Sequence, residues 1–338
     1  MHNFAKGQIV VEYVVEKEYS GRSVKEITAR ALGISSATLK HLKFLDNGIM
    51  KNGSRVNVRE ILYEGDVLSL ATEDTENGEK LKAVELALRI AYEDSELTVP
   101  DKPADMPTHP SRDHYDDTVA NALAFRYNGM GLPFVFRPVN RLDRNTSGLL
   151  LIARNRLSAN TLSRALREGR IRKQYVAILD GTLPESEGLI ETYIRRTAES
   201  IIVREVCGEG EGGDHALTKY KTLLSENGRS IVYAWPLTGR THQLRVHFAS
   251  LGAPITGDDM YGSSSELISR HALHSHVLSF PHPTDGREVC VRSPMHPDME
   301  SLARALFSAE SLTELSEREG GLFSGSLSAE TKTTVAKD

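Results

Sequence analysis

Residues 140–152 read Asn-Arg-Leu-Asp-Arg-Asn-Thr-Ser-Gly-Leu-Leu-Leu-Ile. Here Asp143 stands between Arg141 and Arg144, just ahead of a Thr-Ser-Gly turn and an apolar run typical of a buried strand. An aspartate is expensive to bury without a partner, and neighbouring arginines would keep it ionised. An ionised carboxylate held in one place can act as a nucleophile or a general base. The other interpretation of this stretch is a solvated salt bridge at the entrance of a strand.

Two further segments carry residue types that such chemistry uses. Residues 236–248 read Pro-Leu-Thr-Gly-Arg-Thr-His-Gln-Leu-Arg-Val-His-Phe, and residues 173–181 read Lys-Gln-Tyr-Val-Ala-Ile-Leu-Asp-Gly. Together with residues 140–148, 252–262 and 272–283, these blocks resemble in type and order the motifs of the RluA family of pseudouridine synthases. The resemblance runs from about Tyr92 to about Pro297.

This resemblance implies roles for several side chains. Asp143 would be the catalytic carboxylate, Arg245 would pair with it, and Tyr175 would lie against the flipped uracil. Arg141 would fill the gap that the uridine leaves in the RNA, because the glycosidic carbon is reached only after base flipping. Lys102 falls where the family has an Asn-Lys-Pro motif, and we expect it to be structural or to bind phosphate.

The side-chain chemistry of Arg245 and Tyr175 suits these roles. A guanidinium fork can hold both oxygens of a carboxylate, and an aromatic face stacked on a base contributes about 1–3 kcal/mol. On a strand, Tyr175 shares one face with Lys173 and Ala177, so it can point into a cleft. Taken alone, Arg245 could instead face solvent from a helix, Tyr175 could pack within a sheet, and Arg141 could contact phosphate or form another ion pair.

Two positions depart from the family pattern. Asn140 replaces the usual histidine three residues before Asp143, and Asp101 replaces the usual asparagine before Lys102. Asn140 can still bond locally, so we expect a different hydrogen-bond arrangement but an active enzyme. The residues Asp143, Tyr175 and Arg245 are all present.

Composition narrows the class of protein. The 338 residues suffice for two domains, each with its own core. The two cysteines, Cys207 and Cys290, have no metal-ligand spacing, and no Walker loop or Gly-x-Gly-x-x-Gly turn occurs. We therefore expect no metal and no cofactor. No apolar run is as long as a membrane span, so we expect a cytoplasmic protein that is not membrane-bound.

The N-terminal part is basic although the whole chain carries a net charge of -5. Residues 20–60 contain eight Lys or Arg against three acids, a local charge of +5. Two helices at about 23–31 and 36–45, followed by a hairpin at Asn52-Gly53 and a strand at 68–70, resemble the S4 RNA-binding domain. The alternative is a small folded cap with a solvated basic face. We expect RNA contacts from Arg22, Lys25, Arg30, Lys40, Lys43, Lys51, Lys102, Arg141 and Arg240.

The fold class expected is α+β. Residues 1–71 would form the S4-like domain, 72–80 a linker, 81–307 a catalytic domain with a mixed, mainly antiparallel sheet, and 308–338 a disordered tail. In the catalytic domain we expect helices at 118–127, 158–167 and 241–250. Strands are expected at 90–92, 96–100, 134–139, 149–153, 175–179 and 230–235.

The function that best fits these features is isomerisation of uridine to pseudouridine in structured RNA. The layout resembles synthases that act on large-subunit ribosomal RNA of the 23S type, with tRNA as the alternative substrate, and we expect a monomer. A non-catalytic RNA-binding or ribosome-assembly factor would have lost Asp143, Tyr175 or Arg245. A glycoside hydrolase would need a second carboxylate at a defined distance, and no paired acid motif is present.

Overall fold

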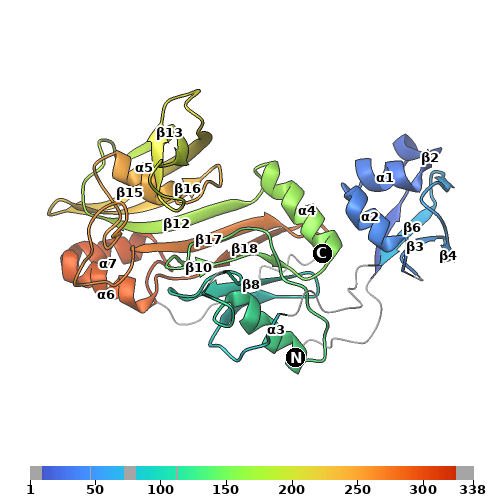
Figure 1. Ribbon diagram of the computed structural model, residues 1–338, viewed down its shortest axis with the longest axis horizontal. Coiled ribbons are helices and arrows are strands. Elements are labelled where there is room, and N and C mark those ends of the chain that lie inside the picture. Colours follow the sequence, from blue (N-terminus) through green and yellow to red (C-terminus); the bar gives the residue numbers. More distant parts are fainter. Residues whose placement is uncertain (1–9, 46, 72–80, 112, 325–338) are drawn as a thin grey trace.

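The computed structural model describes residues 10–45, 47–71, 81–111 and 113–324. They form a small N-terminal unit and a larger domain built on one broad sheet (Figure 1). The expected linker, residues 72–80, lies outside the described residues. Within the described part of the chain, no helix has both the length and the apolar character needed to cross a membrane.

Residues 10–71 form a small unit in which short helices accompany an antiparallel sheet with the strand order β1-β6-β3-β4 (Figure 1). A separate antiparallel pair joins β2 and β5. The elements are β1 (Val10–Val14), η1 (Lys17–Tyr19), β2 (Arg22–Ser23), α1 (Val24–Arg30), α2 (Ser36–Leu42), β3 (Ile49–Lys51), β4 (Ser54–Arg55), β5 (Ile61–Leu62) and β6 (Val67–Ala71).

Local sequence explains where these elements begin and turn. The Ser23 hydroxyl accepts a hydrogen bond from Glu26 N, and the Glu26 carboxylate accepts one from Ser23 N, so α1 starts with a complete capping box. α2 begins after Ser35, whose hydroxyl accepts from the Thr38 amide. Asn52 and Gly53 both have positive φ and join β3 to β4 in the expected hairpin.

The larger domain is built on a twelve-stranded sheet with the order β14-β13-β15-β16-β12-β17-β10-β8-β11-β9, with β18 beside β17 and β7 beside β8. Only β10 and β17 run parallel among its described pairs, which confirms a mixed, mainly antiparallel α+β fold. The strands are β7 (Arg89–Glu93), β8 (Leu97–Lys102), β9 (Arg137–Pro138), β10 (Ser147–Leu149), β11 (Ile152–Ala153), β12 (Arg172–Leu179), β13 (Glu187–Arg196), β14 (Arg204–Cys207), β15 (Asp214–Glu226), β16 (Arg229–Pro236), β17 (Leu273–Pro281) and β18 (Glu288–Arg292).

The helices of this domain are α3 (Val119–Gly129), α4 (Arg156–Arg167), α5 (Gln243–Ser250), α6 (Pro297–Leu306) and α7 (Ala309–Arg318). The first three lie where helices were expected, and β7, β8, β12 and β16 lie where strands were expected. The expected strand 149–153 is divided between β10 and β11.

The strand expected at 134–139 is wrong except for the two residues of β9. The ring of Phe134 stacks on Tyr127 of α3 with 4.8 Å between centroids, so this apolar residue anchors a loop to the core. Pro133 precedes the segment and Pro138 lies within it, and neither has an N–H to donate to a sheet.

The expectation of a disordered tail from residue 308 is also wrong for residues 308–324. Ser308 caps α7, and Leu312 and Leu315 of that helix are buried in the main core together with Leu322 and Phe323. α6 and α7 lie together at one end of the sheet (Figure 1). A few well-spaced apolar side chains suffice to fix this segment although Ser and Glu dominate its composition. Residues 325–338 lie outside the described part.

The small unit contacts the larger domain through α4. Leu157 of α4 is buried in the core of the N-terminal unit, and the Asn160 amide donates to the Thr38 hydroxyl at 2.7 Å. Gly33 approaches Arg164 so closely that a Cβ there would lie 2.1 Å from Nη1. The unit is therefore seated on a helix whose C-terminal residue, Arg167, borders the cleft described next.

Candidate active site

A cleft of about 1220 Å³ brings together the three side chains that were expected to carry the chemistry. Asp143 from the loop before β10, Tyr175 from β12 and Arg245 from α5 all line it. Arg141 and Arg240 line it as well. The volume exceeds the roughly 300–1,000 Å³ of typical small-ligand sites, so the cleft has room for more than one nucleotide.

The loop that carries Asp143 is held by hydrogen bonds on both sides. The Thr146 amide donates to the Asp143 carbonyl at 3.1 Å, which closes the predicted turn. The Thr146 hydroxyl lies 2.8 Å from His271 Nε2, and the Ser147 hydroxyl lies 2.9 Å from His274 Nδ1. Burial lowers the pKa of both histidines to about 3, so both act as neutral hydrogen-bond partners.

Lys102 completes this support, and its expected role as an RNA contact is wrong. The side chain is fully buried, and its ammonium donates to the carbonyls of Pro103, Met106 and Arg144 at 2.7–2.8 Å. Because Arg144 follows Asp143, Lys102 holds the loop that carries Asp143. Burial lowers the pKa of Lys102 to about 7. The alternative structural role is therefore the one found.

Gly148 lets this loop enter the sheet. Its φ is +106°, and a Cβ there would lie 2.4 Å from the carbonyl oxygen of Ser275 on β17. We predict that Gly148→Ala lowers the free energy of unfolding by more than about 2 kcal/mol, because backbone atoms must separate. Denaturant unfolding measures the change. Gly228→Ala is the matched control, since Gly228 has φ +73° with no neighbour within 4 Å; equal losses would contradict the prediction.

The partners of the Asp143 carboxylate are not its neighbours in sequence. Arg245 Nη1 lies 3.6 Å and His242 Nε2 3.9 Å from Asp143 Oδ2, and the carboxylate is about one-third exposed. Arg144 instead donates to Asp105 at 2.7 Å. Arg141 is exposed at the cleft. The expectation that the flanking arginines hold Asp143 is thus wrong: Arg144 pairs with Asp105, and no ion pair joins Arg141 to Asp143 among the described residues.

Arg245 is the shared partner of two carboxylates. Its Nε and Nη2 donate to Asp258 Oδ2 and Oδ1, each at 2.7 Å, in a two-pronged pair that is almost fully buried. Only Nη1 is directed to Asp143. The pairing of Arg245 with Asp143 is found, whereas the fork geometry expected between them is wrong. Burial works against both charges of the Arg245–Asp258 pair, yet the bond between them keeps the pKa of Arg245 raised and that of Asp258 lowered.

Tyr175 lies on the floor of the cleft with 7% of its surface exposed. Burial and the nearby Asp143 charge raise the pKa of its hydroxyl, so it stays protonated at neutral pH. Lys173, two residues earlier on β12, lines the same cleft, as the strand periodicity predicted. An aromatic ring beside a carboxylate gives a place where a base can stack while its sugar faces Asp143.

The two departures from the family pattern have structural partners. The Asn140 side-chain oxygen accepts from the Leu151 amide at 2.8 Å, while its buried Nδ2 has no partner in the described structure. Asn140 therefore forms a local hydrogen bond, as expected. Asp101 faces away from the cleft and binds Arg89 at 2.6 Å and His296 at 3.1 Å. Neither residue contacts Asp143.

The remaining predicted RNA contacts are distributed between two surfaces. Arg240 lies at the cleft, where its Nε donates to the His215 carbonyl. In the N-terminal unit Lys25, Arg30, Lys40 and Lys43 are exposed. Arg22 pairs with Glu26 at 3.6 Å, and Lys51 pairs with Asp66 at 3.1 Å. Both of these cations are therefore already engaged within the protein.

Two side chains at the site, His242 and Asp258, had not been predicted. Both stand in the blocks that were quoted for the family resemblance. Their spacing alone does not tell which of several polar residues faces the cleft. Among the described residues, no group of three His, Cys, Asp or Glu is placed to hold a metal ion.

Comparisons with known proteins agree with this arrangement. The model of the RNA pseudouridylate synthase family matches residues 96–250, which include Asp143, Tyr175 and Arg245. An uncharacterised RNA pseudouridine synthase of Bacillus subtilis is 35% identical over 85% of this chain and 98% of its own. Ribosomal large subunit pseudouridine synthase D of Zymomonas mobilis is 31% identical over 81% and 90%.

Solved structures show the same likeness. The human RNA pseudouridylate synthase domain containing 1 is 31% identical and superposes with a TM-score of 0.52, covering 71% of this chain and 96% of its own. The match to the fold therefore extends well beyond the catalytic motifs.

Proposed function

The chain belongs to the RNA pseudouridylate synthase family, and we propose that it isomerises specific uridines of large-subunit ribosomal RNA to pseudouridine. In this reaction the bond from ribose C1′ to N1 of uracil breaks, the base turns, and a bond forms from C1′ to C5. The proton on C5 leaves and N1 gains one. The observation that carries the proposal is the cleft in which Asp143, Tyr175 and Arg245 meet.

We assign the following roles to these residues. Asp143 faces the anomeric carbon or the ring and carries the covalent or electrostatic step. Tyr175 stacks on the flipped uracil. Arg245, anchored by Asp258, keeps one oxygen of Asp143 in place. Arg141 and Arg240 at the cleft contact the RNA.

The substrate class rests on the relatives named as ribosomal large-subunit enzymes in Zymomonas mobilis and Vibrio cholerae. The test is to incubate the purified protein with transcripts of large-subunit rRNA and with tRNA, and to map pseudouridine by chemical labelling. We expect new sites in the rRNA. Sites in tRNA alone would overturn the substrate assignment, and a folded protein that modifies neither RNA would overturn the function. Mapping in a strain without this protein, against its parent, identifies the position.

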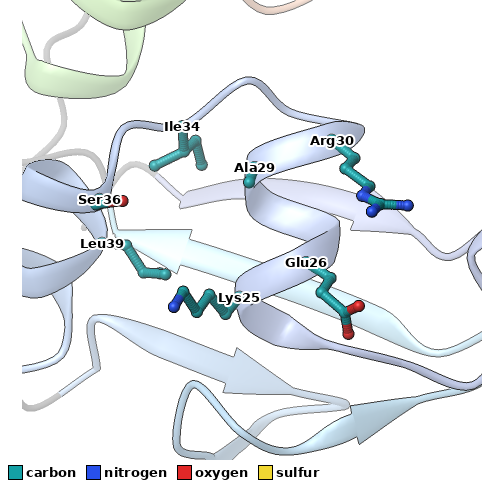
Figure 2. Close-up of a pocket in the computed structure, with 7 residues that line it drawn as sticks. All are labelled: Lys25, Glu26, Ala29, Arg30, Ile34, Ser36 and Leu39. Carbon is teal, nitrogen blue, oxygen red and sulfur yellow. The ribbon is translucent and has the colours of Figure 1, made fainter.

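We further propose that residues 10–71 act as an S4-like RNA-binding domain. Lys25 and Arg30 of α1 border a pocket of about 240 Å³ whose other side is formed by Ser36 and Leu39 of α2 (Figure 2). Cations beside a shallow pocket between two helices suit a phosphate backbone.

We also propose that the enzyme works as a monomer in the cytoplasm. Sedimentation at micromolar concentration tests the oligomeric state, and a dimer in that measurement would show that the monomer proposal is wrong.

The RNA-binding role of this surface predicts a change in salt dependence. Replacing both Lys25 and Arg30 by alanine should weaken RNA binding and reduce the slope of log affinity against log salt by about 1.4–1.8, since each phosphate contact contributes about 0.7–0.9. Binding titrations at several salt concentrations measure it. Arg304→Ala is the control, because Arg304 is exposed on α6, far from this unit (Figure 1). An unchanged slope in the double variant would mean that the basic face is only solvated.

A further inference from the structure

His242 connects the catalytic carboxylate to a chain of hydrogen bonds. Its Nε2 lies 3.9 Å from Asp143 Oδ2, and its Nδ1 lies 2.8 Å from the Tyr261 hydroxyl. The Tyr261 hydroxyl in turn accepts a hydrogen bond from the Arg204 amide at 2.9 Å. The side chain of His242 is only 10% exposed, so its ring nitrogens face these protein groups more than solvent.

This chain, together with the carboxylate, favours one nitrogen of His242 as the site of the proton. Because the Arg204 amide can only donate, the Tyr261 oxygen accepts there, and its own proton is available for His242 Nδ1. The neutral imidazole then carries its proton on Nε2, the nitrogen that faces Asp143. Burial lowers the pKa of His242, as do the charges of Arg245 and Arg204, against the opposing effect of Asp143, so the neutral form prevails at pH 7.

The two donors near Asp143 approach the same oxygen. Oδ2 is the oxygen nearest to both Arg245 Nη1 and His242 Nε2. Among the described residues, no side chain or amide donates a hydrogen bond to Oδ1. The distance of 3.9 Å is longer than a hydrogen bond, which requires about 2.7–3.2 Å, and contacts of this kind often tighten when substrate excludes water.

We propose that His242 is a positioning residue for pseudouridine formation: its Nε2–H, oriented by Tyr261, binds Asp143 Oδ2 when RNA fills the cleft and leaves Oδ1 to react. The inference rests on the function proposed above. It assigns different tasks to the two oxygens of one carboxylate. A neutral donor orients the carboxylate without placing a second positive charge beside it.

His242 and Tyr261 are held by several contacts besides their hydrogen bond. His242 has φ +58°, in the left-handed region, at the start of α5. Its ring meets that of Tyr261 edge to face at 5.7 Å, and the Arg245 guanidinium lies over the same Tyr261 ring at 5.0 Å. Asp258, which binds Arg245, also accepts from the Tyr261 amide at 3.3 Å.

The test compares His242→Asn with His242→Gln. Asparagine tolerates the left-handed backbone but is too short to reach Asp143, whereas the glutamine amide can place a donor near the position of Nε2. We expect His242→Asn to lower the single-turnover rate by roughly tenfold or more while RNA affinity and thermal stability stay near those of the wild type. His242→Gln should recover part of the rate. If both variants keep the wild-type rate, or if they lose affinity instead of rate, the proposal is overturned.

A second measurement reads the tautomer directly. The ¹H–¹⁵N spectrum of the imidazole should show the Nε2–H form in the wild type, and a mixture of both forms in Tyr261→Phe, with a matching loss of single-turnover rate. An Nδ1–H form in the wild type would overturn the proposal. Wild-type activity is established first, because an inactive wild type would refute the proposed function rather than the role of His242.

Discussion

Replacing Asp143 by asparagine should lower the single-turnover rate of pseudouridine formation by at least about a hundredfold, with RNA affinity nearly unchanged. The substitution keeps the size and the place of the side chain in the turn closed by Thr146. It removes the charge and the nucleophilic oxygen. The rate is measured with enzyme in excess over RNA, and affinity is measured in a separate titration.

A matched control lies close by. Asp105 is an exposed aspartate that pairs with Arg144, the residue after Asp143, but does not line the cleft. Asp105→Asn should leave the rate near that of the wild type. If Asp143→Asn retained more than about one hundredth of the activity, another group would have to carry the reaction.

Arg245→Ala should have the largest effect on stability, because it leaves Asp258 buried without a countercharge. Asp258 has no exposed surface, and Arg245 is its two-pronged partner. Removing one member of such a buried pair costs about 3–5 kcal/mol. Denaturant unfolding measures this loss. The double variant Arg245→Ala/Asp258→Asn should be more stable than Arg245→Ala alone; a further loss would mean that the buried charge is not the cause.

Arg245→Lys separates the catalytic contribution of Arg245 from its structural one. A lysine can return a charge to Asp258 but cannot bond to both of its oxygens and to Asp143 at once. We therefore expect a part of the stability to return while the single-turnover rate stays at least about tenfold low. A variant with the wild-type rate would show that the contact with Asp143 is dispensable.

The sequence predicted the parts of this protein that depend on neighbouring residues. The capping box at Ser23 and Glu26, the hairpin at Asn52-Gly53 and the helix at 241–250 all follow from local hydrogen bonds and periodicity. The three residues that the family resemblance named as catalytic, Asp143, Tyr175 and Arg245, do line one cleft. Caps, turns and helical periodicity depend on residues close together in the sequence, and motifs can be read directly from it. Contacts made elsewhere in the fold do not alter them.

What could not be predicted depends on contacts between distant segments. Arg245 could pair with either of two carboxylates, and only the fold places Asp258 on its fork and Asp143 on its remaining nitrogen. Lys102 was expected either to be structural or to bind phosphate, and only the fold shows it buried and bonded to the Arg144 carbonyl in the loop of Asp143. Residues 308–324 belong to a segment with the composition of a disordered tail, and their order comes from a few apolar side chains that pack against the core of the larger domain.

The contact between the N-terminal unit and α4 fixes the distance between two surfaces of the enzyme. Leu157 and the Asn160–Thr38 bond join the unit to a helix whose end borders the cleft, so the basic face near Lys25 and the pocket of Asp143 are held at a set separation. An RNA that engages both must present its uridine at that distance from a second contact. We therefore expect selection to depend on how the RNA is folded more than on the bases around the target, and a short unstructured oligonucleotide with the same local sequence should be a poor substrate.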